Sequence, residues 1–232
     1  MTHAPGGSRP RYAGPHLRRF TLLSLLIGAE FAVVFYGADW LTAQHPLRIH
    51  AYADAELAIP LVPVMVVPYM TMYVIFMFAP LVLPSTADLE RFAGALARVI
   101  VIAGVAFVLL PAEPGFAPVS TAGSIWHPWL QLAAIVSRKY DLVPSLHVAL
   151  FTVCAGTYAR RASTPVRVLL GGWLAVVAAS TVLTHQHHVL DVVTGLLLGA
   201  WGARVATFSG VASRAPRRTT AALGHEGSGC SP

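Results

Sequence analysis

Long apolar stretches separated by polar connections divide this chain into six segments. They cover residues 20–41, 59–83, 92–110, 144–159, 166–183 and 188–208. About 20 consecutive apolar residues, wound as an α-helix, are long enough to cross the hydrocarbon core of a bilayer. The pattern therefore predicts an all-α polytopic membrane protein with six transmembrane helices.

A shorter apolar stretch precedes the fourth segment. It runs from Ile125 to Leu132 and carries Trp126, His127 and Trp129. Aromatic side chains are enriched at the headgroup layer of a membrane. We therefore expect a short interfacial helix before the fourth transmembrane helix.

The two ends of the chain differ from its apolar centre. Residues 1–19 are rich in Gly, Pro and Arg, and residues 209–232 are polar. Both are predicted to be disordered cytoplasmic tails flanking one membrane domain, residues 20–208. The basic residues before the first segment are typical of a signal peptide, but this segment is longer than a signal core and contains Glu30, so a retained helix is expected.

Composition supports the membrane class. Hydrophobic residues make up 56% of the chain and charged residues 11%, whereas soluble domains are about 25% charged. The net charge is +6. The arginines behind it are clustered near segment ends, which is typical of membrane topology and contact with anionic lipids. No nucleic-acid partner is predicted.

The distribution of lysine and arginine predicts the orientation. Cytoplasmic connections carry the excess of these residues, and placing both termini in the cytoplasm leaves only Arg48, Arg138 and Lys139 on the opposite side. The connections after the third and fifth helices then share one face, which we expect to be the non-cytoplasmic face of a plasma (inner) membrane. The cytoplasmic set is Arg9, Arg11, Arg18, Arg19, Arg91, Arg160, Arg161, Arg167, Arg204, Arg214, Arg217 and Arg218.

The first chemical motif, Pro144-Ser145-Leu146-His147, opens the fourth segment. Proline suits the first turn of a helix, and the free N–H groups of that turn attract anions. Ser145 adds a hydroxyl that either contacts phosphate or caps the helix. His147 is placed to exchange a proton with a bound ester.

The second motif, His187 to Asp191, opens the sixth segment. Residues four apart lie on one helical face, so the carboxylate can keep one imidazole nitrogen protonated and leave the other as a nucleophile. A purely structural hydrogen bond is the alternative. His185 and His188 could join His187 in a zinc site, but adjacent helical positions point apart, so no metal or other cofactor is expected.

The two motifs on six helices resemble the type 2 phosphatidic acid phosphatase superfamily over about residues 55–205. The residues around the two motifs are most similar to those of the branch that includes inositol-phosphorylceramide synthases. The resemblance implies a phosphatase or phosphotransferase acting on a lipid phosphate or diphosphate. It also implies a phosphohistidine on His187, which Asp191 orients, and a general acid/base at His147.

This sequence departs from the family pattern in its cations. The Lys and Arg that clamp phosphate near the end of the third helix are absent from residues 110–114, and Ser180-Thr181 lacks the arginine of the usual Ser-Arg pair. Arg138, Lys139 and His185 are the candidate replacements, beside Ser145, in binding substrate. The alternative is a catalytically silent, lipid-binding membrane protein of the same fold.

Two charged residues lie inside predicted transmembrane helices. They are Glu30 and Arg98. An ionised group at mid-bilayer is costly and seeks a partner. We therefore predict a structural contact between these two side chains, or else that Arg98 extends to the cytoplasmic surface.

Overall fold

The computed structural model describes residues 14–117, 120–137, 140 and 142–208. Within these ranges the chain is helical and forms no strand. The α-helices are α1 (Gly14–Ala43), α2 (Val66–Met77), α3 (Ala79–Val82), α4 (Thr86–Leu109), α5 (His127–Ser137), α6 (Leu146–Ala159), α7 (Thr164–Leu183) and α8 (Val189–Phe208). Two 3-10 helices, η1 (Asp54–Ala58) and η2 (Pro63–Met65), lie between α1 and α2.

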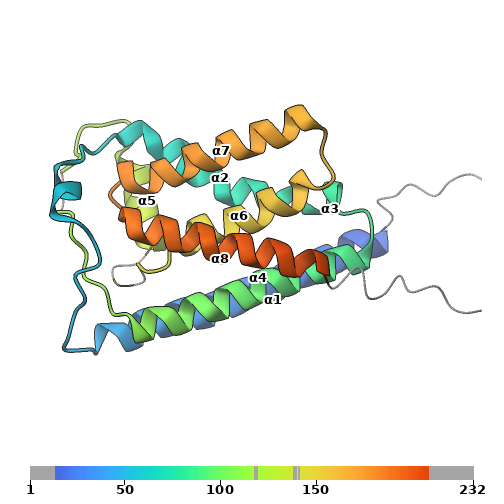
Figure 1. Ribbon diagram of the computed structural model, residues 1–232, viewed down its shortest axis with the longest axis horizontal. Coiled ribbons are helices and arrows are strands. Elements are labelled where there is room, and N and C mark those ends of the chain that lie inside the picture. The colour runs from blue at the N-terminus through green and yellow to red at the C-terminus, as the bar shows by residue number, and fades with distance from the viewer. Residues whose placement is uncertain (1–13, 118–119, 138–139, 141, 209–232) are drawn as a thin grey trace, which may run out of the picture.

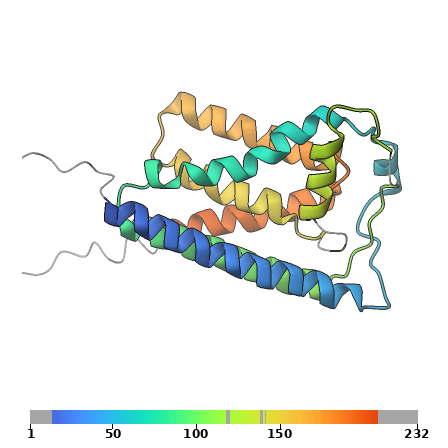
Figure 2. The ribbon, with the colours of Figure 1, turned by 180° about the vertical axis from the view of Figure 1, so that it is seen from behind.

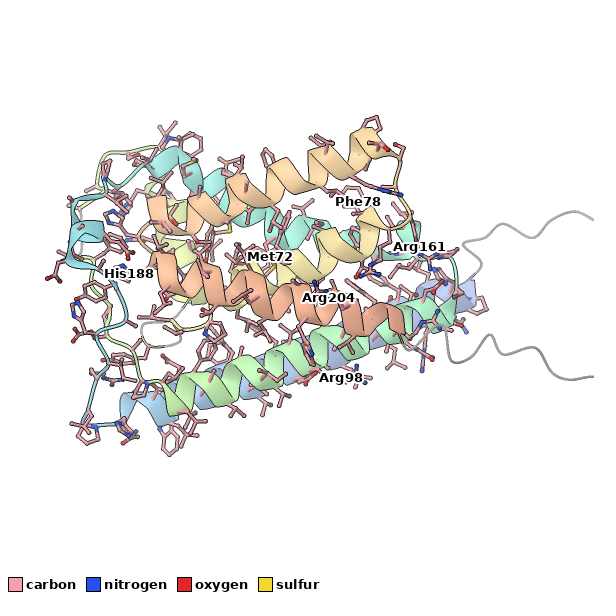
Figure 3. All side chains as sticks on the ribbon, viewed as in Figure 1. Met72, Phe78, Arg98, Arg161, His188 and Arg204 are labelled. Carbon is pink, nitrogen blue, oxygen red and sulfur yellow. The ribbon has the colours of Figure 1, made fainter. Side chains whose placement is uncertain are left out.

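The long helices run back and forth along one axis (Figure 1). α1, α4 and α7 end where α6 and α8 begin, and α5 lies at that same end, as the reverse view also shows (Figure 2). We call it the histidine end, because it carries His147, His187 and His188. The opposite end is the arginine end, with Arg91 and Arg161; Figure 3 labels His188 and Arg161 at the two extremes.

Four helices are long and apolar enough to span a membrane, as expected of an integral membrane protein. They are Gly14–Ala43, Thr86–Leu109, Thr164–Leu183 and Val189–Ala206. Two shorter apolar helices, Pro63–Met77 and Leu146–Ala159, occupy the remaining predicted segments. The all-α class is confirmed, while the count of six spans and an interfacial place for α5 remain predictions.

The second predicted segment is not one continuous helix. α2 ends at Met77 and α3 begins at Ala79. Pro80 has no N–H to donate to Phe76, and its ring would clash with that carbonyl in a continuous helix. The helix is therefore interrupted at Phe78, and the short α3 that follows ends at Val82.

α1 begins earlier than predicted, at Gly14, so residues 14–19 are helical rather than part of a disordered tail. Tertiary contacts hold this first part of α1. A ring nitrogen of His16 contacts the carbonyl of Pro80 at 3.2 Å, and Arg19 pairs with Glu90 at 2.6 Å. Residues 1–13 and 209–232, the rest of the predicted tails, lie outside the described residues.

Helices α6 and α8 pack closely enough to bring their first turns together. A Cβ at Gly195 would lie 2.5 Å from the carbonyl oxygen of Ser145, and one at Gly199 would lie 2.4 Å from that of Ala149. Only glycine permits such an approach of one helix to the backbone of another. Two glycines one turn apart on α8 therefore set the spacing of the two motif-bearing helices.

The predicted contact between Glu30 and Arg98 is not formed. The exposed Arg98 donates a hydrogen bond to the carbonyl of Gly94 at 3.0 Å, one turn nearer the start of α4. Among the described residues no ion pair joins it to Glu30. A long side chain can reach polar surroundings by extending along its own helix, and here it extends toward the arginine end.

Candidate active site

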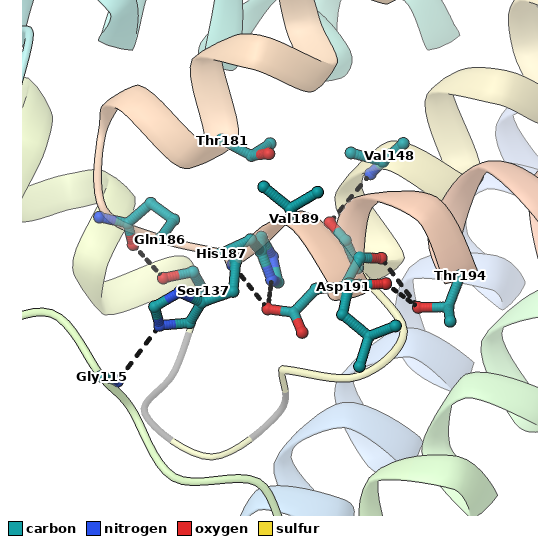
Figure 4. Close-up of polar contacts among 12 residues, drawn as sticks. Gly115, Ser137, Val148, Thr181, Gln186, His187, Val189, Asp191 and Thr194 are labelled. Carbon is teal, nitrogen blue, oxygen red and sulfur yellow. Dashed lines mark hydrogen bonds and ion pairs between the residues drawn. The ribbon is translucent and has the colours of Figure 1, made fainter. Parts of the chain in front are cut away.

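The pair His187 and Asp191 lies at the start of α8, but His187 precedes the helix. Asp191 is the third helical residue, and its carboxylate accepts the N–H of His188 at 2.8 Å, one half of a capping box. Its same oxygen, Oδ2, lies 3.4 Å from Nδ1 of His187 (Figure 4). The predicted contact is present, although it is made by a helix cap and not by one helical face.

Both members of the pair are buried: the side chain of His187 is 4% exposed and that of Asp191 is 1% exposed. The contact is long for a hydrogen bond, and catalytic hydrogen bonds often tighten only when substrate is bound. Since Nδ1 faces the carboxylate, Nε2 is the nitrogen available for attack. The geometry thus suits a nucleophilic imidazole.

Ser145 connects the two motifs. It is the N-cap residue of α6, and its hydroxyl oxygen accepts the N–H of Val148 at 3.4 Å. Its own N–H donates to the backbone carbonyl of Asp191 at 2.9 Å. Ser145 is fully buried, and Pro144 lies before the cap instead of in the first turn. These contacts favour the capping interpretation of Ser145.

His147 lies in the first turn of α6, and its ring already has a partner. Nε2–H donates to the carbonyl of Tyr69 at 2.7 Å, and the ring stacks on that of Tyr69 with centroids 3.9 Å apart. This tautomer leaves Nδ1 free to exchange a proton. His147 and His187 line the same small cavity of about 30 Å³, so the fold brings the two predicted histidines together.

His185 does not join them. It has a left-handed backbone, with φ of 57°, which turns its ring away. Nε2 contacts the carbonyl of Ile59 at 3.0 Å, and the ring stacks on Phe116 at 4.0 Å. The three neighbouring histidines therefore face different partners: Ile59 for His185, Asp191 for His187 and Glu56 for His188. This divergence excludes the zinc alternative for these three rings as placed.

The remaining predicted ligands, Arg138 and Lys139, lie outside the described residues. The hydroxyls of Ser180 and Thr181 donate to carbonyls of their own helix, those of Val177 and Ala178. The backbone carbonyl of Thr181 accepts the N–H groups of Gln186 and His187, at 3.0 and 3.1 Å, so this position fixes the turn that leads to His187.

Sequence reasoning missed the layer that covers this site. Five rings from three segments lie in the order His50, Tyr52, His188, Phe116 and His185, with neighbouring centroids 3.9 to 4.4 Å apart. All neighbours stack except His50 and Tyr52, whose rings are tilted by 40°. Glu56 of η1 contacts His188 beside the stack. The sequence had singled out His185 and His188 but not the other members. His50, Tyr52, Glu56 and Phe116 come from connections with no periodic pattern, so nothing local in the sequence distinguishes them from solvent-exposed positions.

Arg48 was counted in the sequence only as a topology marker. Ile49, the next residue, forms a bridge with Ala112, in the segment where the family's clamp residues are missing. The guanidinium carbon of Arg48 lies 4.0 Å from the centre of the Tyr140 ring, in the connection leading to Ser145. Its buried Nη1 has no hydrogen-bond partner. A buried donor left unpaired is costly, and a bound anion would satisfy it.

An apolar groove adjoins the small cavity at the two histidines. Its volume is about 370 Å³, and α1, α2, α4 and α6 line it. Four residues line both spaces, namely Phe31, Met72, Tyr73 and Leu150. A long apolar group and a phosphorus centre could therefore be held side by side.

The fold and site define a helical membrane protein whose buried His–Asp pair and second histidine lie on two adjacent helix starts. The chain belongs to the PAP2 superfamily, whose sequence model matches residues 39–205, from the last turns of α1 into α8. No curated protein matches the chain, and no solved structure does. Membership in this superfamily supports a phosphatase-type enzyme acting on phosphate esters.

Proposed function

We propose that the protein is a membrane phosphatase or phosphotransferase acting on a lipid phosphate or diphosphate through a phosphohistidine at His187. One observation carries the proposal: His187, which contacts Asp191, and His147, 40 residues earlier in sequence, line one cavity where two helix starts meet. A nucleophile with an orienting carboxylate and a nearby acid/base is the arrangement that covalent catalysis requires.

In the first step, Nε2 of His187 attacks phosphorus. The P–N bond forms as the bond from phosphorus to the leaving oxygen breaks. Nδ1 of His147 takes up a proton from the phosphate hydroxyl of the bound substrate and passes it to the leaving oxygen. Asp191 keeps Nδ1 of His187 protonated and stabilises the positive charge that develops on the ring. No metal enters this step.

In the second step, an oxygen nucleophile attacks the phosphohistidine. His147 takes its proton, the P–N bond breaks, and His187 is regenerated. Water gives hydrolysis, whereas a lipid or inositol hydroxyl gives transfer, as the resemblance to inositol-phosphorylceramide synthases suggests. The same residues support both outcomes.

The phosphoryl oxygens need cations, since phosphoryl transfer depends on stabilising their charge. We assign this role to Arg48, on the basis of its unpaired Nη1 and its bridge to the segment without clamp residues. Arg138 and Lys139 remain candidates beside it. They belong to the same connection as Tyr140, over which Arg48 lies.

A lipid substrate is supported by the apolar groove that shares four lining residues with the site cavity. The apolar part of such a substrate would lie among α1, α2, α4 and α6, with its phosphate at the histidine end. We place the histidine end on the non-cytoplasmic side of a plasma (inner) membrane. The arginines gather at the other end, and cytoplasmic connections carry the excess of these residues.

A phosphatase assay on the purified protein tests the proposal. Phosphatidate, an isoprenyl diphosphate and a soluble phosphate ester are compared, in chelator, with His187→Ala as the control. We expect the wild type to turn over a lipid substrate in the presence of chelator, and His187→Ala to show no turnover. Specific lipid binding without turnover would favour the alternative, a catalytically silent lipid-binding protein of the same fold. The absence of the clamp residues supports this alternative.

A further inference from the structure

Glu56 reaches the start of α8 from a distant part of the chain. Its Oε2 accepts the N–H of Val189, the first residue of α8, at 2.8 Å, and lies 3.2 Å from Nδ1 of His188. The two positions are 133 residues apart in the sequence, and the Glu56 side chain is only 13% exposed. Glu56 therefore caps α8 from outside the helix, as a local N-cap side chain does elsewhere.

His188 connects this cap to two further segments. Its Nδ1–H donates to Glu56, and its Nε2 accepts the N–H of Gly115 at 3.3 Å. The ring is held between Tyr52 and Phe116, with centroids 4.3 and 4.4 Å away. Burial lowers the pKa of His188, so the ring is neutral near pH 7, as one donated and one accepted hydrogen bond require.

The backbone of His188 continues the chain of contacts to the pair. Its N–H donates to Oδ2 of Asp191, the oxygen that faces His187. Burial acts to raise the pKa of Glu56, but the N–H groups of Val189 and Ala53 and the ring of His188 outweigh it, and the pKa is lowered. Two carboxylates thus occupy the first free N–H groups of α8, where the helix dipole stabilises them.

This occupancy has a consequence for substrate binding. The N–H groups of His188 and Val189 are already paired with Asp191 and Glu56, so the α8 N-terminus offers no anion site there. A carboxylate placed so close to the nucleophile would also repel phosphate if it pointed into the cavity. Glu56 is not among the residues lining that cavity, which fits a supporting role.

We propose that Glu56 is a positioning residue for the reaction at His187. By fixing the first turn of α8 and the ring of His188, it holds the Asp191 carboxylate against Nδ1 of His187. This inference rests on the proposed function. Residues that hold a metal ligand in its orientation typically lower affinity or activity by about 10- to 100-fold when removed, and we expect a loss of the same size here.

The test compares Glu56→Gln and Glu56→Ala with Asp54→Asn. Asp54 lies on the same 3-10 helix, is 88% exposed and pairs with the exposed ring of His50. We expect kcat to fall about 10- to 100-fold in Glu56→Ala and less in Glu56→Gln, with KM little changed. Asp54→Asn should keep wild-type kcat and KM.

A second readout does not depend on turnover. The ¹⁵N spectrum of His187 in detergent, assigned with His187→Asn, reports which ring nitrogen carries the proton. We expect mainly Nδ1–H in the wild type and in Asp54→Asn, and a mixture of tautomers in Glu56→Ala. A wild type without turnover would overturn the proposed function, yet this spectrum would still test the placement of the pair.

Two outcomes would overturn the positioning role. One is a wild-type kcat and an unchanged His187 spectrum in both Glu56 variants. The other is a Glu56→Ala protein that loses thermal stability alone, with the same kcat per folded molecule as Asp54→Asn. A purely structural cap predicts this second result.

Discussion

The two ends of the helical bundle both carry charged pairs, but they differ in burial. At the arginine end, Arg19 and Glu90 pair at 2.6 Å with side chains 41% and 47% exposed. At the histidine end, the pair His187–Asp191 is 4% and 1% exposed. Figure 3 places His188 and Arg161 at these opposite ends.

Burial changes what such pairs imply. An exposed ion pair contributes about 0–1 kcal/mol and is expected wherever a helix end meets polar surroundings. A buried carboxylate beside a histidine costs desolvation energy that apolar side chains would not, and adds little net stability. The arginine end therefore indicates how the bundle is anchored, whereas the histidine end is where we propose that chemistry takes place.

The largest effects are expected from the two histidines proposed as catalytic, His187 and His147. His187→Ala should remove turnover to background, and His147→Ala should lower kcat by about 10²–10⁴-fold. The double variant should be no worse than His187→Ala, because nucleophile and acid/base act as a unit. Single-turnover assays and acid-labile labelling of His187 measure this. Wild-type turnover in His187→Ala would refute the assignment.

The ends should also differ completely in access from outside the cell. In a background with Cys154→Ala and Cys230→Ser, Ala117→Cys near the histidine end should react with an impermeant thiol reagent in intact cells. Ser163→Cys, equally exposed at the arginine end, should react only after lysis. The reverse pattern would place the site in the cytoplasm.

Asp191→Asn should lower kcat strongly but leave more residual turnover than His187→Ala. The amide disturbs the tautomer of His187 without deleting the attacking nitrogen. Because Asp191 also accepts the N–H of His188, melting of the variant in detergent should be followed alongside kcat. Equal turnover in Asp191→Asn and His187→Ala would show that the carboxylate does more than orient the ring.

A smaller effect is expected at Arg48. Arg48→Gln removes a charged donor and should raise KM for the lipid phosphate about tenfold, since hydrogen bonds to charged groups contribute about 1.5–3 kcal/mol. Arg160→Gln, at the arginine end, is the matched control and should leave KM unchanged. An unchanged KM in Arg48→Gln would assign the phosphate contact to other cations, Arg138 and Lys139 first.

The smallest effect is expected at the exposed pair. Glu90→Gln should change the free energy of unfolding by less than about 1 kcal/mol, because its partner Arg19 remains solvated. Its kcat should equal that of the wild type. Thermal melting and turnover of Glu90→Gln, measured beside Glu56→Gln, compare the two ends directly. A loss of turnover in Glu90→Gln would contradict the view that only the histidine end supports activity.

The sequence by itself determined the helical class, the membrane-spanning character and the pairing of His187 with Asp191. Each depends on short-range spacing: apolar runs of fixed length, or two residues four apart near a helix start. The meeting of His147 and His187 in one cavity also agrees with the prediction, because both were assigned to helix starts at one membrane face. The first three properties follow from a few consecutive turns of chain, whereas this meeting also needed the orientation given by the lysines and arginines.

Only the tertiary structure decided which groups surround that pair. The sequence did not reveal that Glu56 caps α8 across 133 residues, that the backbone of His185 turns its ring toward Ile59, or that Arg98 avoids Glu30. Irregular connections carry no periodicity that would relate one segment to another. Their contacts are selected by the packing of whole helices, such as the close approach of α6 to Gly195, and so become visible only when the chain is folded.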